Sequence, residues 1–418
     1  MTFEELQRLL DPEVQAVIDL HSAEDSVTFA MQFHSHKDIP VRAIAEQLAC
    51  RQKAAKKLPH FSNHKFLFSP LALEQASGEL TAQYKTSLMS GKRVIDASGG
   101  LGVDSIFLSR VFQEVLYCER DALLCALFQH NLKQSGITNV LVKNAESIDL
   151  LASYPDDYFD WIYVDPARRE HGSRSIGLES SSPNVVASHE TFLRKSERVC
   201  IKASPALELS GLKELLPSLQ SIIVVSVDRE CKEILLLLHR SGLHKTPLFK
   251  AVCMSSASEV ITEVAGGTAI EKNIASSLKN YIYEPDAAII KAKLTAKLAR
   301  DLSIEFMNKT VDYLTSDLLL ESFPGRTFRM IECVLYKPKT FRTFLERHGI
   351  IGASIQRRDF PHSPEEIRKK YRLLESDRTF LFFTRDVEGR PVAVYCIRYF
   401  SEGGGVLSGQ DRNAGPVC

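Results

Sequence analysis

A glycine-rich turn between an acidic residue and an expected helix is the segment best suited to bind a ligand. Asp96 ends a short apolar run, the turn Gly99-Gly100-Leu101-Gly102 follows, and a helix is expected from about Val103. Glycines let the backbone approach a ligand and leave N–H groups free at a helix N-terminus. An acid here favours a ligand with an ammonium group and repels the pyrophosphate of a dinucleotide. NAD is also disfavoured because Ser105 stands where the GxGxxG pattern needs its last glycine.

Polar residues also end the next expected strands. Glu119 follows Asp96 by 23 residues and is placed to accept the hydroxyls of a ribose, although an acid there can also simply cap a helix. Asn144-Ala145-Glu146 comes where an adenine would lie or a helix would begin. Asp165-Pro166-Ala167-Arg168-Arg169 ends the fourth strand. Because ligands of open α/β sheets bind outside the carboxyl ends of the strands, we expect these groups on one rim.

The elements that position this rim form a repeating pattern. Short β-rich runs alternate with amphipathic stretches, which predicts a βαβ series and hence a parallel sheet with helices on both faces. Cys231–Leu238 is predicted as either a further strand or a buried helix. Lys202–Pro205, at the end of the fifth expected strand, is predicted to line the rim as well. The expected strands are Arg93–Ala97, Glu114–Cys118, Val140–Lys143, Phe159–Val164, Arg198–Lys202 and Ser221–Val227.

The two ends of the chain have different patterns. Apolar residues on a 3.6 period predict a helical piece from Thr2 to about Lys57. After a break at Gly266-Gly267, a helical stretch is expected over about 285–302. A βαβαββ unit follows, whose second helix is capped by Ser363. The expected domains are a helical one over 1–60, a sheet domain over 61–265 and an α+β domain over 280–400, basic from 324, before a disordered tail over 401–418.

Composition excludes several classes of protein. The 418 residues are 44% hydrophobic and 25% charged, which is typical of a soluble globular protein. No apolar run approaches the roughly 18 residues of a membrane span, and the N-terminus resembles no targeting segment, so we expect a cytoplasmic protein. Nine scattered cysteines without a CxxC pair, and histidines without a metal pattern, predict no metal site.

The charge is unevenly distributed although the net charge is zero. Residues 324–400 hold 16 Lys and Arg but 9 Asp and Glu. A basic C-terminal region on an otherwise acidic chain suggests an acidic partner such as nucleic acid, although a solvated helical face would give the same count.

Three of these motifs, in this order and spacing, resemble the class I S-adenosylmethionine-dependent methyltransferases: Asp96–Gly102, Glu119 and Asp165–Arg169. Other motifs resemble the bacterial subgroup with a C-terminal THUMP-like domain. They are Glu74–Ser77, Thr81–Lys85, Tyr283–Pro285 with Lys291, and Phe323–Arg326. The resemblance covers roughly residues 40 to 400. It implies a Rossmann-like α/β methyltransferase sheet with a helical N-terminal piece and a C-terminal α+β, THUMP-like domain.

The resemblance also assigns roles to residues. S-adenosyl-L-methionine is the implied cofactor, and Asp165 would face its methyl group and the substrate, beside Pro166 and Arg168. Ala167 and Arg168 stand where methyltransferases of base amines usually have a second proline and an aromatic, which argues against that reaction. The residues implied in cofactor binding are Asp96, Ser98, Gly99, Gly100, Gly102, Glu119, Ala145 and Glu146, and those implied in substrate binding are Arg168, Arg169, Arg357 and Arg358.

Three interpretations of function remain open at this point. The first is a methyltransferase of tRNA or rRNA in which the C-terminal domain grips RNA. The second is a methyltransferase of a small molecule or protein, and the third an RNA-binding protein with a vestigial cofactor site. Methyl transfer is an in-line displacement in which Asp165 would accept a proton and Arg168 would hold a phosphate or carboxylate. Cys200, inside the fifth strand, is expected to be buried. We expect RNA as partner, no membrane and no metal.

Overall fold

The structure is a computed structural model that describes residues 1–63, 65–168, 177–242 and 245–399. The expected tail 401–418 lies outside the described residues. The chain forms two compact units. The N-terminal unit holds Met1–Val227, Cys231–Phe249 and Met254–Glu259, and the C-terminal unit holds Asp228–Glu230, Lys250–Cys253 and Val260–Cys418. The domain limits expected from the sequence stay a prediction.

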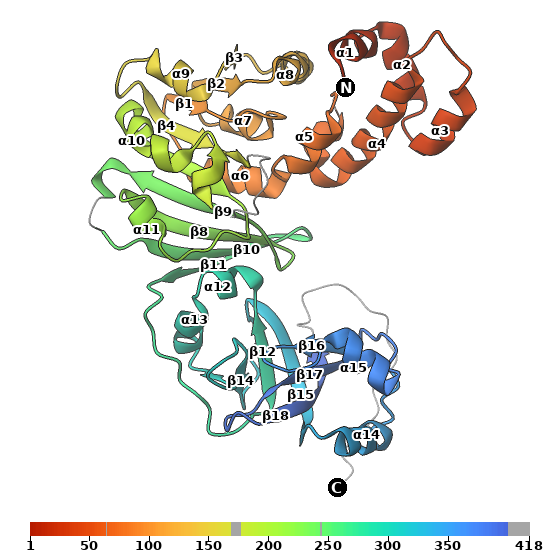
Figure 1. The fold of residues 1–418 in the computed structure, drawn as a ribbon, viewed down its shortest axis with the longest axis vertical. Coiled ribbons are helices and arrows are strands. Elements are labelled where there is room, and N and C mark those ends of the chain that lie inside the picture. The colour runs from red at the N-terminus through yellow and green to blue at the C-terminus, as the bar shows by residue number, and fades with distance from the viewer. Residues whose placement is uncertain (64, 169–176, 243–244, 400–418) are drawn as a thin grey trace. The chain divides into compact units, whose positions relative to one another are not determined.

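The chain begins with helices, which confirms the helical N-terminal piece (Figure 1). Asp11 and Asp25 cap two of these helices with side-chain oxygens that accept backbone N–H groups, and Thr2 starts the first with a capping box. Their apolar faces pack into one core with the helices that follow the first two strands. The helices are α1 (Phe3–Leu9), α2 (Pro12–Leu20), α3 (Ser26–Phe33) and α4 (Val41–Lys57), followed by a 3-10 turn, η1 (Pro59–Asn63).

A nine-stranded sheet follows, in the order β11-β10-β8-β9-β7-β4-β1-β2-β3. From β7 to β3 the neighbouring strands are parallel, as a βαβ series predicts. All six expected strands are present. The strands are β1 (Arg93–Asp96), β2 (Glu114–Glu119), β3 (Val140–Asn144), β4 (Phe159–Val164), β7 (Ser196–Ala203), β8 (Leu219–Val227), β9 (Glu230–His239), β10 (Leu248–Ser255) and β11 (Ser258–Gly266).

The prediction of a parallel sheet is wrong at one edge. Cys231–Leu238 lies within strand β9, which pairs antiparallel with β7. The cause is the connection before it, because only Asp228 and Arg229 separate β8 from β9 and both have positive φ. A two-residue turn of this kind joins antiparallel strands, whereas parallel strands need a crossover of about a dozen residues.

Helices cover the sheet on both faces. In Figure 1, α9 and α10 lie on one side of the central strands and α6, α7 and α8 on the other. The bounds are α5 (Pro70–Gln75), α6 (Glu79–Ser87), α7 (Val103–Leu108), α8 (Ala122–Ser135), α9 (Ser147–Ala152), α10 (Val185–Lys195) and α11 (Leu212–Leu215). Short elements join them: β5 (Ala167–Arg168), η2 (Leu178–Ser180), β6 (Ser181–Ser182) and η3 (Arg240–Gly242).

The C-terminal unit has its own seven-stranded sheet, in the order β13-β14-β12-β15-β18-β17-β16. Its last part is the expected βαβαββ unit, and Ser363 and Glu366 form the predicted capping box. The elements are β12 (Tyr281–Pro285), α12 (Ala287–Lys291), α13 (Thr295–Asp301), β13 (Glu305–Phe306), β14 (Leu314–Ser316), β15 (Gly325–Leu335), α14 (Pro338–Arg347), β16 (Ser354–Arg357), α15 (Pro364–Tyr371), β17 (Thr379–Arg385) and β18 (Pro391–Tyr399).

The helical stretch expected over about 285–302 is present but divided. Two short helices, α12 and α13, occupy this range. Lys293 lies between them with a φ of 59°, in the left-handed region, which ends the first helix before the second begins.

Candidate functional site

The glycine-rich turn joins β1 to α7 in a conformation that needs its glycines. Gly100 and Gly102 have φ values of 56° and 81°, which other residues rarely adopt. A Cβ on Gly102 would lie 2.0 Å from a ring carbon of Phe128, and one on Gly99 would lie 2.3 Å from the ring of Tyr117. Close packing against these rings therefore fixes the path of the turn, and α7 begins directly after it.

Asp96 is a buried charge beneath this turn. The residue is 1% exposed, and its carboxylate accepts hydrogen bonds from Ser105 Oγ (2.7 Å) and the Ser98 backbone N–H (3.1 Å). Burial, with a further contribution from the neighbouring carboxylates of Asp104 and Asp165, raises the pKa of Asp96 to about 7 against the opposing hydrogen bonds from Ser105 and Ser98. The group therefore exchanges its proton near neutral pH.

Glu119, at the end of β2, lies beside the glycine-rich turn. Its carboxylate accepts the backbone N–H groups of Gly100 and Asp121, each at 2.9 Å. The backbone N–H of Ala145 donates to the Glu119 carbonyl (3.1 Å), so the end of β3 joins the same rim. Glu146 is exposed and starts α9 as its N-cap residue. The predicted cofactor residues of β1, β2 and β3 thus lie at neighbouring strand ends.

Asp165, directly after β4, is tied to two other strand ends. Its backbone N–H donates to Ser98 Oγ (2.6 Å), and its carboxylate forms an ion pair with the ammonium group of Lys202 on β7. Its side chain is 33% exposed, against 14% for Lys202. Although burial lowers the pKa of Lys202, the carboxylates of Asp165, Glu233 and Asp104 together outweigh it and raise that pKa above its usual value. The Lys202 ammonium group is therefore charged at neutral pH, and the Asp165 side chain is still reachable from solvent.

A buried network of charges lies behind this pair. The Lys85 ammonium group contacts both carboxylate oxygens of Glu233 (3.0 and 2.8 Å), Ser77 Oγ (2.9 Å) and the Asp104 carboxylate (3.2 Å). Tyr163, two residues before Asp165 on β4, donates its hydroxyl to Asp104 (2.9 Å). Burial opposes the charge of Lys85, but the Asp104 and Glu233 carboxylates hold its pKa well above the usual range. The network fixes α6, α7, β4 and β9 in one arrangement.

The sequence pattern did not predict Lys202 and Lys85 as partners of these acids. It placed Lys202 at the rim without a partner, and Lys85 only within a motif of the resemblance. Asp165 and Lys202 are 37 positions apart in the sequence, and Lys85 and Glu233 are 148 positions apart. No local spacing pattern could therefore predict these ion pairs. Cys200 is fully buried as expected, and burial raises the pKa of its thiol, which makes it a poor nucleophile.

The predicted substrate residues lie in different parts of the structure. Arg168 pairs through its backbone with Ser181 in the short β5–β6 ladder, and Arg169 lies outside the described residues. In the C-terminal unit, Arg357 donates twice to the carbonyl of Phe360, at 2.9 and 2.6 Å, so its guanidinium group serves the local fold. Arg358 pairs instead with an acidic side chain of β12.

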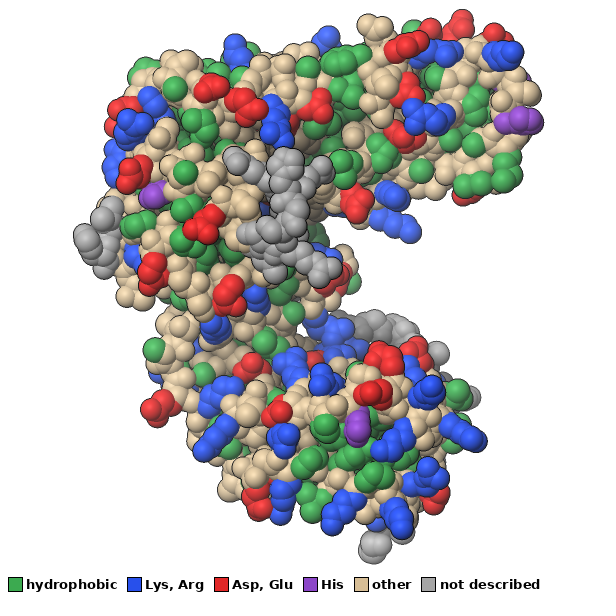
Figure 2. Space-filling view, in the orientation of Figure 1, with side chains coloured by type: hydrophobic (Ala, Val, Ile, Leu, Met, Phe, Trp, Pro, Cys, Tyr) green, Lys and Arg blue, Asp and Glu red, His purple; other side chains and the backbone are tan. Residues whose placement is uncertain are grey.

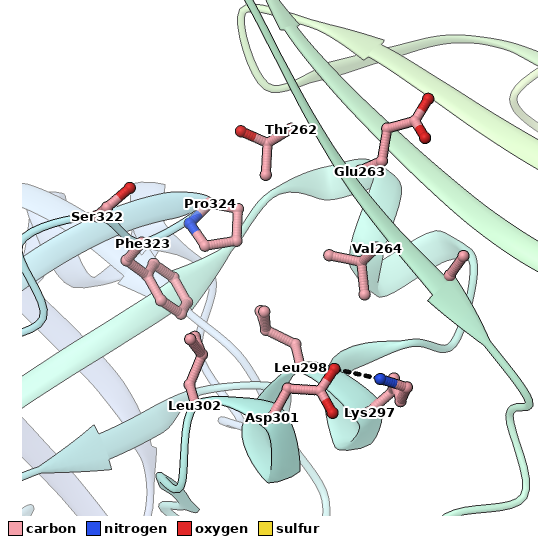
Figure 3. Close-up of a pocket in the computed structure, with 11 residues that line it drawn as sticks. Thr262, Glu263, Val264, Lys297, Leu298, Asp301, Leu302, Ser322, Phe323 and Pro324 are labelled. Carbon is pink, nitrogen blue, oxygen red and sulfur yellow. Dashed lines mark hydrogen bonds and ion pairs between the residues drawn. The ribbon is translucent and has the colours of Figure 1, made fainter.

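A pocket of about 470 Å³ in the C-terminal unit contains none of the predicted site residues (Figure 3). It is lined by apolar residues such as Phe323 and Leu298 and by the ion pair of Lys297 and Asp301. Among the described residues, no group of three or more His, Cys, Asp or Glu side chains is arranged to hold a metal ion. None of the helices in the described ranges has the length and apolar character of a membrane span.

Comparisons with known proteins find similarity over most of the chain. Residues 325–398 match the family model described as THUMP domain-like. Two curated proteins from strains of Mycobacterium tuberculosis are each 22% identical over 349 residues, 82% of this chain and 92% of theirs. Both are named uncharacterized S-adenosylmethionine-dependent methyltransferases. A crystal structure from Porphyromonas gingivalis W83, provisionally described as a methyltransferase, superposes with a TM-score of 0.81 and 24% identity over 95% of this chain and 100% of that one.

The comparisons confirm the main predictions from the sequence. The fold is a Rossmann-like methyltransferase sheet with a helical N-terminal piece and a THUMP-like α+β region at the C-terminal end. The resemblance to the S-adenosylmethionine-dependent methyltransferases is confirmed, because the relatives that match most of the chain carry that name. The roles of individual residues and the identity of the substrate stay predictions.

Proposed function

We propose that the protein is an S-adenosylmethionine-dependent methyltransferase of RNA, with Asp165 at the transfer site. The observation that carries the proposal is the rim at which a buried Asp96, the glycine-rich turn and Glu119 lie beside the ion pair of Asp165 and Lys202. When bound, S-adenosylmethionine supplies a methyl group on a positively charged sulfur.

The residues of the rim fit this cofactor. The buried Asp96 carboxylate provides negative potential for its ammonium and sulfonium groups. A Cβ on Gly100 would meet only the Ser98 carbonyl oxygen, at 3.6 Å, so the turn is less crowded there than at Gly99 or Gly102. Glu119 can accept the ribose hydroxyls by giving up the hydrogen bond from the Gly100 N–H. Ala145 and Glu146, directly after β3, would lie beside the adenine of the cofactor.

Asp165 would orient the substrate nucleophile and accept its proton as the methyl group is transferred. The Asp165 carboxylate would hold the substrate nucleophile in line with the methyl group that S-adenosylmethionine supplies, and it would take up the proton that the nucleophile loses. Lys202 fixes the direction of this carboxylate, and Ser98 fixes the backbone beneath it. Positioning of this kind is the main contribution that an enzyme makes to an in-line displacement.

RNA is the substrate that the charge distribution favours. The basic surplus falls within residues 324–400, and the THUMP domain-like match covers 325–398 of the same region. Figure 2 shows Lys and Arg side chains spread over the visible face of the C-terminal elements, with acidic side chains between them. Positive side chains on such a surface would position RNA through its phosphates without reading its bases.

Mass spectrometry of total RNA from cells with and without the gene tests this proposal. We expect one methylated nucleoside to disappear without the gene and to return when the wild-type chain is supplied. An unchanged set of RNA methylations, together with a lost methylation of a protein or small molecule, would favour that other substrate class.

A further inference from the structure

Four arginines from distant parts of the sequence gather around one carboxylate in the C-terminal unit. The carboxylate is that of Glu284, on β12. The arginines come from the β8–β9 turn, the start of β15, the residue after β16 and the strand β18. They are Arg229, Arg326, Arg358 and Arg398.

Two of these arginines are held in place by direct contacts. Arg326 forms an ion pair with Glu284 and donates to Gln356 Oε1 (3.0 Å), and Arg358 lies 3.3 Å from the other carboxylate oxygen of Glu284. The side chains of Arg326 and Glu284 are only 16% and 13% exposed. The Arg358 guanidinium group also lies 4.7 Å from the centroid of the Tyr313 ring. One carboxylate is therefore shared by two fixed guanidinium groups.

The other two arginines add positive charge beside this pair. Burial lowers the pKa of Arg398, and repulsion from Arg229 and Arg326 lowers it further. For Arg229 the causes are the same, burial first and then repulsion from Arg326. Glu284 opposes the repulsion in both cases. Both arginines thus lie close enough to Arg326 and Glu284 to interact with them electrostatically.

Two further acids lie near Arg229, and each has a place in the local fold. Asp228 is its neighbour in the turn, and Asp286 raises the pKa of Arg229 from the start of α12. The Asp286 side chain is buried and accepts the backbone N–H of Ala288 (2.8 Å) as the N-cap of that helix. An anion that approached the four guanidinium groups would relieve their repulsion.

We propose that Arg229, Arg326, Arg358 and Arg398 form a binding site for a backbone phosphate of the RNA substrate. The proposal rests on the proposed function and adds to it the place where the substrate is held. Guanidinium groups present planar pairs of N–H donors that match two oxygens of a phosphate, and arginine stays charged when partly buried. Arg229 follows β8 in the sequence, outside the THUMP domain-like match, so the site draws on two regions of the sequence.

Arg229→Gln and Arg398→Gln test the site without removing the ion pair of Arg326 and Glu284. Each variant should weaken binding of a single-stranded RNA about tenfold, as expected when a charge-assisted hydrogen bond is lost. Each should also reduce the slope of log affinity against log salt by about 0.7. The matched control is Arg347→Gln, which removes the same charge from an exposed pair with Glu332 on α14 and β15 and should change affinity less than about twofold.

Pyrophosphate, used as a probe without bases, separates this site from the proposed function. The full-length protein should bind pyrophosphate in calorimetry, and both variants should lose most of that binding. RNA affinity and methylation equal to wild type in both variants would overturn the site while the proposed function stands. Binding of pyrophosphate but not of RNA would overturn RNA as the source of the phosphate, and the proposed function with it. Absence of pyrophosphate binding in the wild type would overturn the anion site.

Discussion

Asp96→Asn should stabilise the protein at alkaline pH and leave it almost unchanged in acid. The native pKa of Asp96 is raised to about 7 from a usual value of 3.8. Between these two values the native state keeps a proton that the unfolded chain has released, so this group makes stability fall as the pH rises through that window. Above a pH of about 7 both states are ionised, and the native carboxylate costs its full burial penalty.

The size of the effect follows from the shift in pKa. About three pKa units at about 1.4 kcal/mol each give a penalty near 4 kcal/mol at about pH 8, and less than about 1 kcal/mol near pH 4. Asparagine has the same shape and no charge, so it removes this penalty. It can still accept the hydrogen bond that the Ser98 backbone N–H donates.

Urea denaturation followed by fluorescence measures this difference. Trp161 is the only tryptophan of the chain and is buried on β4, so its emission reports unfolding of the sheet. The free energy of unfolding of Asp96→Asn should exceed that of the wild type by a margin that grows with pH. The control Asp149→Asn, at an exposed acid of α9, should stay within about 0.5 kcal/mol at every pH. A constant margin between Asp96→Asn and wild type would refute the reasoning. The same variant should bind S-adenosylmethionine more weakly.

Three further variants test the rim. Glu119→Ala should weaken binding of S-adenosylmethionine by about 1.5 to 3 kcal/mol in calorimetry, and an unchanged affinity would remove Glu119 from the site. Lys202→Met should abolish most turnover by releasing Asp165, whereas Lys202→Arg should restore part of it; equal rates for both would show that the pairing is unimportant. Gly102→Ala should lower the free energy of unfolding by about 2 to 4 kcal/mol, because the new Cβ meets the Phe128 ring at a positive φ, and a wild-type denaturation curve would contradict this.

The sequence predicted the strands of the βαβ series well, because each is a short apolar run followed by a distinct turn. It could not decide on Cys231–Leu238, since a continuous apolar run has no period of two. The turn before that run, Asp228-Arg229, contains neither glycine nor asparagine, so nothing local marked a hairpin. The break at Lys293 was missed for the same reason, because lysine rarely adopts a positive φ.

The sequence predicted the site residues that stand at the ends of strands. It did not predict the ion pairs that these residues form with distant lysines. Asp96, Glu119 and Asp165 follow strands, and the parallel arrangement brings them to one rim. The partners Lys202 and Lys85 come from elements whose distance in space depends on the packing of the whole sheet. Nothing in the sequence indicates their partners, and only the folded chain shows that both lysines are counter-ions of buried or partly buried acids.

The most direct test of the account is methyl transfer by the purified protein to RNA. RNA from cells that lack the gene is incubated with S-adenosylmethionine carrying a labelled methyl group and either the wild-type chain or Asp165→Asn. The account predicts label in RNA with the wild type and a loss of transfer of at least about a hundredfold with Asp165→Asn, while S-adenosylmethionine still binds to the variant. Equal labelling by both chains, or label from the wild type only in the protein or small-molecule fraction, would contradict it.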